Sequence, residues 1–339
     1  MSQSLSKSLI SILMPVKNAG PFLKECLDSI LAQTETNWEL IAINDHSTDD
    51  SNQILKHYSN KDFRIKVFEN KGRGIIHALR LAYAKCEGNL ITRMDADDLM
   101  PAKKLATLKN MLIDQGIGYL ATGKVRYFSS TEVGGGYQRY ESWLNQLMDA
   151  GDPFREIYKE CVIPSPCWMI WRKDFERCGA FQPETYPEDY DLCFRFYAAG
   201  LKVTSSEDIL HLWRDSQNRA SRILPEYADN RFLSLKINWF LKLEVNEDIP
   251  IVVWGAGSKG KWIANYLINE NIPFLWVTNN QKKIGVNING IILKDFEALK
   301  TMSGFNAIVA VANMDDQKEI LFFLEKNFLN QSARVFFFC

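Results

Sequence analysis

The chain has 339 residues, with 40 Lys and Arg against 41 Asp and Glu, so its formal net charge is −1 at neutral pH. The length favours two domains, and the balanced charge argues against nucleic-acid binding driven by overall electrostatics. Hydrophobic content of 46% is ordinary for a globular protein, and no apolar stretch approaches the roughly 20 residues that cross a bilayer.

Cysteine usage and the start of the chain bear on localisation. The seven cysteines include no C-x-x-C pair, which predicts neither a zinc site nor a disulfide framework. The apolar run Leu9–Val16 is short and contains Ser11 and Pro15, unlike a signal peptide. We therefore expect a cytoplasmic protein, with any membrane contact peripheral and at the inner face of the cell membrane.

Strand and helix patterns alternate through the first hundred residues. Apolar runs predict strands at 9–16, 38–44, 65–69 and 89–94, and helical spacing predicts helices at 22–33, 51–58 and 75–86. This β-α alternation predicts an α/β fold with a parallel sheet and helices on both faces. Ligands of such sheets bind at the carboxyl ends of the strands.

Acidic residues follow two of these predicted strands. Asp45 opens a polar loop after the second, and Asp95, Asp97 and Asp98 lie directly after the fourth, preceded by Arg93. Three carboxylates in four residues repel one another without a cation, and their oxygens suit Mg²⁺ or Mn²⁺. Arg93 is expected to pair with one of the acids. The alternative is a solvated turn in which Asp98 caps the next helix.

The remaining elements predict a second, smaller unit. A helix at 101–115, strands at 119–128 and 165–172, a helix at 192–199 and strands near 203 and 207–213 follow, and then a polar loop at 214–222. A long helical pattern at 225–243 precedes strands at 250–254, 274–277, 307–311 and 334–338. We predict domains at 1–222 and 249–339, with a helical linker at 223–248.

Six short motifs occur in order between residues 10 and 222. They are ILMPVKN (12–18), DSILAQT (28–34), WELIAINDHSTD (38–49), GRG (72–74), RMDADDL (93–99) and PEDYDL (187–192). Their order resembles that of the inverting glycosyltransferases of family 2. The resemblance implies the GT-A fold, a mostly parallel mixed sheet with helices on both faces, and transfer of a sugar from a nucleotide diphosphate.

The resemblance also implies how the donor is bound. Asp45 would accept a hydrogen bond from the N3–H of uracil or thymine, which cytosine lacks, so a UDP-sugar is favoured. Pro15, Arg73 and Arg219 match or lie near donor-binding positions, and Arg222 is an alternative to Arg219 for holding the diphosphate. For the loop arginines, solvated side chains are the alternative, and for Asp45 it is helix capping.

For the metal and the base, the resemblance points to two acidic motifs. Asp97, with Mg²⁺ or Mn²⁺, would neutralise the diphosphate while Asp95 contacts the donor. His211 lies where some GT-A enzymes place a metal ligand. Asp189 would take the proton of the acceptor hydroxyl, with Glu188 and Asp191 as alternative bases and helix capping as the alternative role.

Gly255-x-Gly257-x-x-Gly260 lies between a predicted strand and a predicted helix, as in a dinucleotide-binding fingerprint. The acid that binds ribose is missing, because Thr278 and two asparagines follow the next strand. We therefore expect a Rossmann-like module in which NAD binding is unlikely. It would pack, form a homo-oligomer or bind another nucleotide.

The sequence thus favours a hexosyl- or N-acetylhexosaminyltransferase of cell-envelope polysaccharide synthesis. Its partners would be a nucleotide sugar and a glycan or lipid-linked acceptor, with no nucleic acid. A nucleotidyltransferase is the alternative enzyme. Such enzymes usually have a Gly-rich basic loop directly after the first strand, and this sequence lacks one. A non-catalytic nucleotide sensor acting through residues 255–260 is the other alternative.

Overall fold

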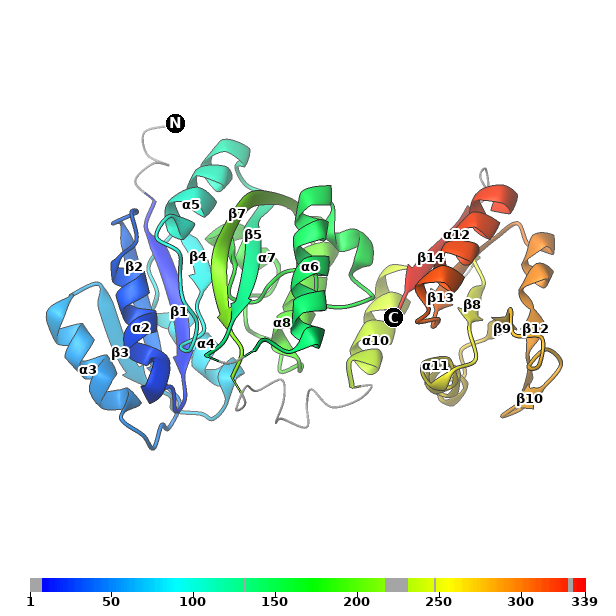
Figure 1. Cartoon of the computed structure of the whole chain (residues 1–339), viewed down its shortest axis with the longest axis horizontal. Helices are drawn as coiled ribbons and strands as arrows, with labels where there is room; N and C mark the ends of the chain where they lie inside the picture. The colour runs from blue at the N-terminus through cyan, green and yellow to red at the C-terminus, as the bar shows by residue number, and fades with distance from the viewer. Residues whose placement is uncertain (1–7, 131, 217–230, 247, 329–331) are drawn as a thin grey trace. The chain divides into compact units, whose positions relative to one another are not determined.

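The computed structural model describes the chain except residues 1–7, 131, 217–230, 247 and 329–331. It divides into two compact units. The first comprises residues 1–155 and 161–223, and the second comprises 156–160 together with 224–339. Each unit is α/β (Figure 1).

A seven-stranded mixed sheet forms the centre of the first unit, in the order β3-β2-β1-β4-β6-β5-β7. Its strands are β1 (Ile10–Val16), β2 (Trp38–Asn44), β3 (Ile65–Glu69), β4 (Leu90–Arg93), β5 (Tyr119–Phe128), β6 (Trp168–Trp171) and β7 (Lys202–Arg214). Pairing is parallel except on either side of β6, which runs antiparallel to β4 and β5.

Helices cover both faces of this sheet. They are α2 (Gly20–Leu31), α3 (Ser51–Lys61), α4 (Ile75–Lys85), α5 (Lys104–Gln115), α6 (Gly135–Ala150), α7 (Arg172–Arg177) and α8 (Glu188–Ala198). Alternate β1 side chains, such as Ile12 and Met14, share one buried cluster with α2, α3, α5 and α6. The other face carries α4 over β1 and β2, and α7 over β4 and β6. Both faces of β1 and β2 are buried, which explains their near-continuous apolar runs.

The direction of the strands brings distant loops to one edge. β1, β2, β3 and β4 are mutually parallel. Because β6 is antiparallel to both β4 and β5, β5 runs in the same direction as β4, and so does β7, which is parallel to β5. The loops after all of these strands therefore lie at the same edge of the sheet. A backbone bridge between Leu99 and Leu212 joins the acidic loop after β4 to the end of β7.

The second unit contains a parallel sheet in the order β12-β9-β8-β13-β14. Counted along the chain, this order is 3-2-1-4-5, as in doubly wound nucleotide-binding sheets. Its elements are α10 (Arg231–Leu243), β8 (Ile251–Trp254), α11 (Ser258–Asn269), β9 (Phe274–Thr278), β10 (Asn287–Ile288), β11 (Ile291–Ile292), β12 (Lys294–Asp295), a 3₁₀ helix (Phe296–Thr301), β13 (Gly304–Val309), α12 (Met314–Phe328) and β14 (Ser332–Phe337).

Several elements differ from the sequence-based prediction. The strand predicted at 165–172 is the short interior strand β6, and the two strands predicted after residue 203 form the single strand β7. Helix α8 begins at Glu188, four residues earlier than predicted, so its acids lie in the first turn. None of the described helices has the length and apolar character needed to cross a membrane.

Candidate functional site

Asp45 ties two loops together at the sheet edge. It follows β2 and is 3% exposed. Asn70 Nδ2 donates to its carboxylate at 2.6 Å, the backbone N–H of Gly74 donates at 3.0 Å, and Lys17 Nζ lies at 3.7 Å. Gly74 has φ +92°, a conformation that favours glycine, at the start of α4. A carboxylate accepts about four hydrogen bonds, so Asp45 retains capacity for about one more donor.

The turn after β1 lies against the same loop. Asn18 Oδ1 accepts from the backbone N–H of Thr48 at 2.8 Å, and Asp49 Oδ2 accepts from Gly20 N–H at 2.9 Å. His46 has φ +56°, a conformation that favours glycine, and its Nε2 is bonded to the Gly72 carbonyl at 2.7 Å. Pro15, the predicted donor contact, lies in β1 beside this turn.

The acidic triplet has three different environments. Asp95 Oδ1 accepts from Arg93 at 2.6 Å, so the expected pairing of Arg93 with an acid is confirmed. Asp97 is partly exposed. Asp98 is 2% exposed and bonds to His211 Nε2 at 2.9 Å. Its predicted role as a helix cap is wrong, because α5 begins only at Lys104 and no side chain caps it.

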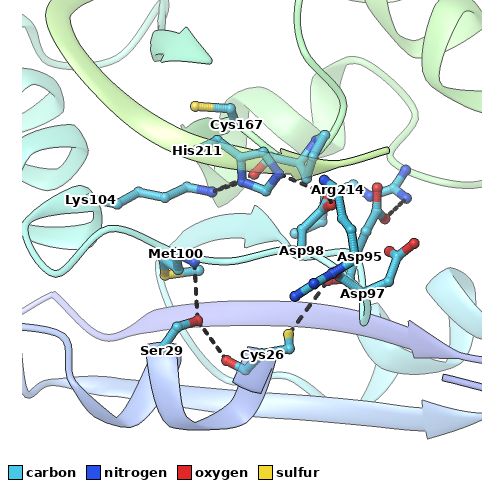
Figure 2. A network of polar contacts seen from close by, with 12 residues as sticks. Cys26, Ser29, Asp95, Asp97, Asp98, Met100, Lys104, Cys167, His211 and Arg214 are labelled. Carbon is cyan, nitrogen blue, oxygen red and sulfur yellow. Dashed lines mark hydrogen bonds and ion pairs between the residues drawn. The ribbon is translucent and has the colours of Figure 1, made fainter. Parts of the chain in front are cut away.

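A buried chain of polar groups, from Lys104 through His211 to Asp98, supports this triplet (Figure 2). Lys104 is fully buried, and its Nζ lies 2.5 Å from the Pro166 carbonyl and 3.1 Å from His211 Nδ1. A charged ammonium can only donate, so His211 Nδ1 accepts and its Nε2–H donates to Asp98. Burial lowers the pKa of Lys104. Both ring nitrogens of His211 are thus engaged, and it would bind a metal only by breaking one of these bonds.

Arg214 closes the acidic loop from the end of β7. Its backbone N–H donates to Asp98 Oδ1 at 2.7 Å, and its side chain donates to the Asp97 carbonyl and to Glu25 Oε2, each at 2.6 Å. The guanidinium also lies over the Phe22 ring, 4.6 Å from its centroid. Sequence reasoning placed Arg214 in a loop and gave it no role, because one side of the contact is 116 residues away.

Three carboxylates occupy the first turn of α8, and their surroundings differ. Asp191 pairs with Arg195 at 2.8 Å, and Glu188 lies 3.3 Å from Arg93 Nη1. Among the residues that the structure describes, Asp189 has no cationic partner in ion-pair contact, and its Oδ1 accepts from the Tyr190 N–H at 2.8 Å. Asp189 is therefore the carboxylate of this turn that is least neutralised.

The environment of Asp189 tunes its acidity. Burial and then the Glu188 carboxylate raise the pKa of Asp189 to about 7, while Arg93 acts in the opposite direction. A general base works best when its pKa lies near the working pH. Asp189 is consequently the group of this turn best suited to exchange a proton at neutral pH.

The side-chain oxygens of the acidic loop fit a divalent metal that prefers oxygen ligands. The acidic loop offers carboxylate oxygens, the ligands preferred by Mg²⁺ and Mn²⁺. Within the described residues, no three His, Cys, Asp or Glu side chains converge as a complete metal site. A metal held there would therefore need further ligands from water and from a diphosphate, as is usual for Mg²⁺.

The predicted site residues differ in how far the structure locates them. Arg73 is exposed in the loop 72–74, next to Gly74 and hence to Asp45. Arg219 and Arg222 lie outside the described residues. Sequence reasoning missed Asn70 and Lys104, since an asparagine in a loop and a lysine in a helix carry no signal until their partners are known.

The glycines of residues 255–260 have separate roles in the second unit. Gly255 has φ +112°, and an added Cβ would lie 3.0 Å from the Ala310 carbonyl. At Gly260 a Cβ would lie 2.2 Å from the Gly255 carbonyl, so this glycine permits close packing of α11. At Gly257 a Cβ would meet nothing within 4 Å. Gly255 and Gly260 are therefore required by the local backbone, whereas the space around Gly257 would accommodate a side chain.

Comparison with known proteins agrees with this arrangement. Residues 11–179 match the family described as glycosyl transferase family 2. The glycosyltransferase GlyA of Streptococcus pneumoniae is 31% identical over 225 residues, a match that covers 64% of this chain but only 32% of that protein.

Two solved structures share the fold at low sequence identity. S. aureus TarS 1-349 in complex with UDP-GlcNAc has a TM-score of 0.54 and 16% identity, and the match covers 76% of this chain and 71% of that TarS fragment. The mannosyltransferase PcManGT from Pyrobaculum calidifontis, in complex with GDP-Man and Mn²⁺, has a TM-score of 0.52 and 17% identity, covering 77% and 74%. The first unit has the GT-A fold, and with it the chain belongs to glycosyltransferase family 2.

Proposed function

We propose that the protein is a metal-dependent inverting glycosyltransferase that transfers a sugar from a nucleotide diphosphate, with a UDP-sugar favoured, to a hydroxyl of a glycan or lipid-linked acceptor. The observation that carries the proposal is that three carboxylates lie at one edge of the sheet. One would bind the nucleotide, one would bind the metal and one would act as the base. These are Asp45, Asp97 and Asp189. GlyA is a glycosyltransferase by name, and TarS and PcManGT were solved with nucleotide sugars, which supports a donor of this class.

In the proposed reaction, the residues of the chain bind, orient and move a proton. Asp45 and the loop 72–74 hold the base of the nucleotide, and Arg73 lies within reach of the same region. Asp97 would hold the metal, which supplies positive charge to the departing diphosphate. Asp189 takes the acceptor proton as the hydroxyl attacks the anomeric carbon from the opposite face. A single displacement inverts the configuration.

The proposal is tested by incubating the full chain with Mn²⁺ and a panel of UDP-, GDP-, CMP- and dTDP-sugars, and by determining the product anomer by NMR. Asp97→Ala should reduce kcat/KM by about 10³-fold, because charge stabilisation of the leaving group is usually a large contribution. Asp114→Ala is the matched control, an aspartate of α5 outside the proposed site. Pyrophosphate release from a nucleoside triphosphate would instead indicate a nucleotidyltransferase, and equal turnover by Asp97→Ala would refute the metal assignment.

For the second unit we infer a Rossmann-like module whose glycine turn is intact but whose ribose-binding acid is replaced by Thr278. The strand order and the glycine geometry support this inference. NAD should therefore leave the thermal midpoint unchanged at millimolar concentration, whereas a bound ligand stabilises by mass action. A shift of several degrees with NAD would contradict it.

A further inference from the structure

One arginine physically joins the two acidic motifs of the site. Arg93 is the last residue of β4, and Glu188 is the first of α8, 95 residues later. Arg93 Nη2 donates to Asp95 Oδ1 at 2.6 Å, and its Nη1 lies 3.3 Å from Glu188 Oε1. The arginine is 3% exposed and the glutamate 6%. The guanidinium thus spans from the acidic loop to the helix that carries Asp189.

This bridge is poorly designed for stability alone. Arg93 Nε and Glu188 Oε2 are buried and have no hydrogen-bond partner among the described residues. A buried ion pair with unsatisfied atoms is often no more stabilising than apolar side chains of similar volume. Buried polar atoms without partners call for another explanation. The position of the bridge, between two motifs of one site, supplies it.

Asp189 is surrounded mainly by negative charge. The Glu188 carboxylate belongs to its own helix, and Asp95 faces it from the loop after β4. Among the described residues, Arg93 is the cation that acts on the acidity of Asp189. The two acids raise the pKa of Asp189 and Arg93 lowers it. Without Arg93, three carboxylates would share this region with no compensating charge.

We propose that Arg93 is a positioning residue, which holds the start of α8 against the donor-side loop and keeps Asp189 able to release its proton. The inference rests on the proposed function, in which Asp189 is the base. In this assignment Arg93 contacts neither the acceptor hydroxyl nor the anomeric carbon. It acts through Asp95 on one side and through Glu188 on the other.

The test is the pH dependence of kcat/KM, whose acidic limb reports the base of the free enzyme. In Arg93→Gln the limb should move to higher pH by about one unit, so that activity falls about tenfold below the limb and recovers at high pH. Arg93→Lys should restore most of the limb because it keeps the charge. Glu188→Gln removes a like charge and should move the limb in the opposite direction.

Arg64→Gln is the matched control. Arg64 also forms a half-buried ion pair, with Asp62 at 2.6 Å, but it lies before β3 and does not act on Asp189. A stability loss by itself should therefore leave the limb in place. If Arg93→Gln and Arg64→Gln lower activity equally at every pH, Arg93 has a merely structural role and the inference is overturned.

A second readout separates this inference from the proposed function. The Asp189 carboxylate is titrated by ¹³C NMR in the wild-type protein, Arg93→Gln, Arg93→Lys and Glu188→Gln, with no substrate present. Opposite shifts of the Asp189 pKa in Arg93→Gln and Glu188→Gln support the bridge even if no tested donor is turned over. Turnover that depends on Asp189, combined with identical titrations in all variants, refutes the bridge and leaves the function intact.

Discussion

At the scale of single residues, the site distinguishes carboxylates that look equivalent in the sequence. Asp191 and Glu188 each lie beside an arginine, whereas Asp189 does not, and the pKa of Asp189 is raised to about 7 by burial and by Glu188. The acidic loop shows the same principle, since Asp98 is committed to His211 while Asp97 is partly exposed. The role of each acid follows from its neighbours.

The raised pKa of Asp189 predicts how stability depends on pH. Folding favours its protonated form, so its contribution is complete below the unfolded pKa of about 4 and is lost as pH rises through about 7. The side chain in Asp189→Asn cannot ionise. At pH 8 the free energy of unfolding of this variant should exceed that of the wild type by about 1–3 kcal/mol, and at pH 4 the two should differ little.

The measurement is calorimetry of both proteins across this pH range, alongside sugar transfer. The variant should gain stability while losing nearly all transfer activity. Equal melting temperatures of Asp189→Asn and the wild type at pH 8 would show that the folded protein does not disfavour the charged form of Asp189. Asp191→Asn is the comparison, because Arg195 compensates that charge and its loss should destabilise the protein.

At the scale of elements, α5 and β7 jointly position the acidic loop. Lys104 extends from the first turn of α5. His211 and Arg214 extend from β7, more than a hundred residues after the loop that they contact. The backbone bridge between Leu99 and Leu212 fixes the register of this contact. The contacts made by α5 and β7 therefore determine the shape of the acidic loop.

Removing the buried ammonium should show this support. Lys104→Met leaves the Pro166 carbonyl and His211 Nδ1 without their donor, which should lower stability by about 3 kcal/mol. It should also weaken donor binding in the presence of Mn²⁺, since His211, which bonds to Asp98, loses the group that orients its ring. Denaturant unfolding and calorimetric titration with a UDP-sugar measure the two effects.

Lys109→Met provides the control from the same helix. Lys109 lies in the same helix as Lys104 and forms a buried pair with Glu35 at 2.6 Å. The control should lose comparable stability and keep donor affinity. If both variants bind the donor equally well, the chain of groups from Lys104 to Asp98 does not organise the site.

At the scale of the whole molecule, the second unit takes a segment from the middle of the chain. Residues 156–160 belong to it rather than to the unit on either side of them in sequence. The Tyr158 ring stacks on Phe338 with centroids 5.4 Å apart and meets Phe240 edge-on at 5.9 Å, and its hydroxyl donates to Glu244 at 3.0 Å. This segment cannot be recognised from its position in the sequence.

Tyr158→Ala should destabilise the second unit by about 3–5 kcal/mol, as expected for a buried aromatic side chain. Tyr158→Phe should lose only about 1 kcal/mol, from the hydrogen bond to Glu244. Urea unfolding followed by tryptophan fluorescence measures both. Phe63→Ala, at a side chain that is 90% exposed, should change nothing. A neutral Tyr158→Ala would contradict the assignment of this segment.

The sequence by itself determined the α/β class, the family and the motifs, because apolar periodicity and strand-end chemistry are local properties of the chain. It could not reveal that Asp98 binds His211 rather than capping a helix, that Lys104 bonds to the same histidine, or that Arg93, whose pairing with an acid it predicted, also reaches Glu188. Those contacts join residues about a hundred positions apart. Only the pairing of β4, β6, β5 and β7 decides which of them meet, and therefore which carboxylates lie beside a cation.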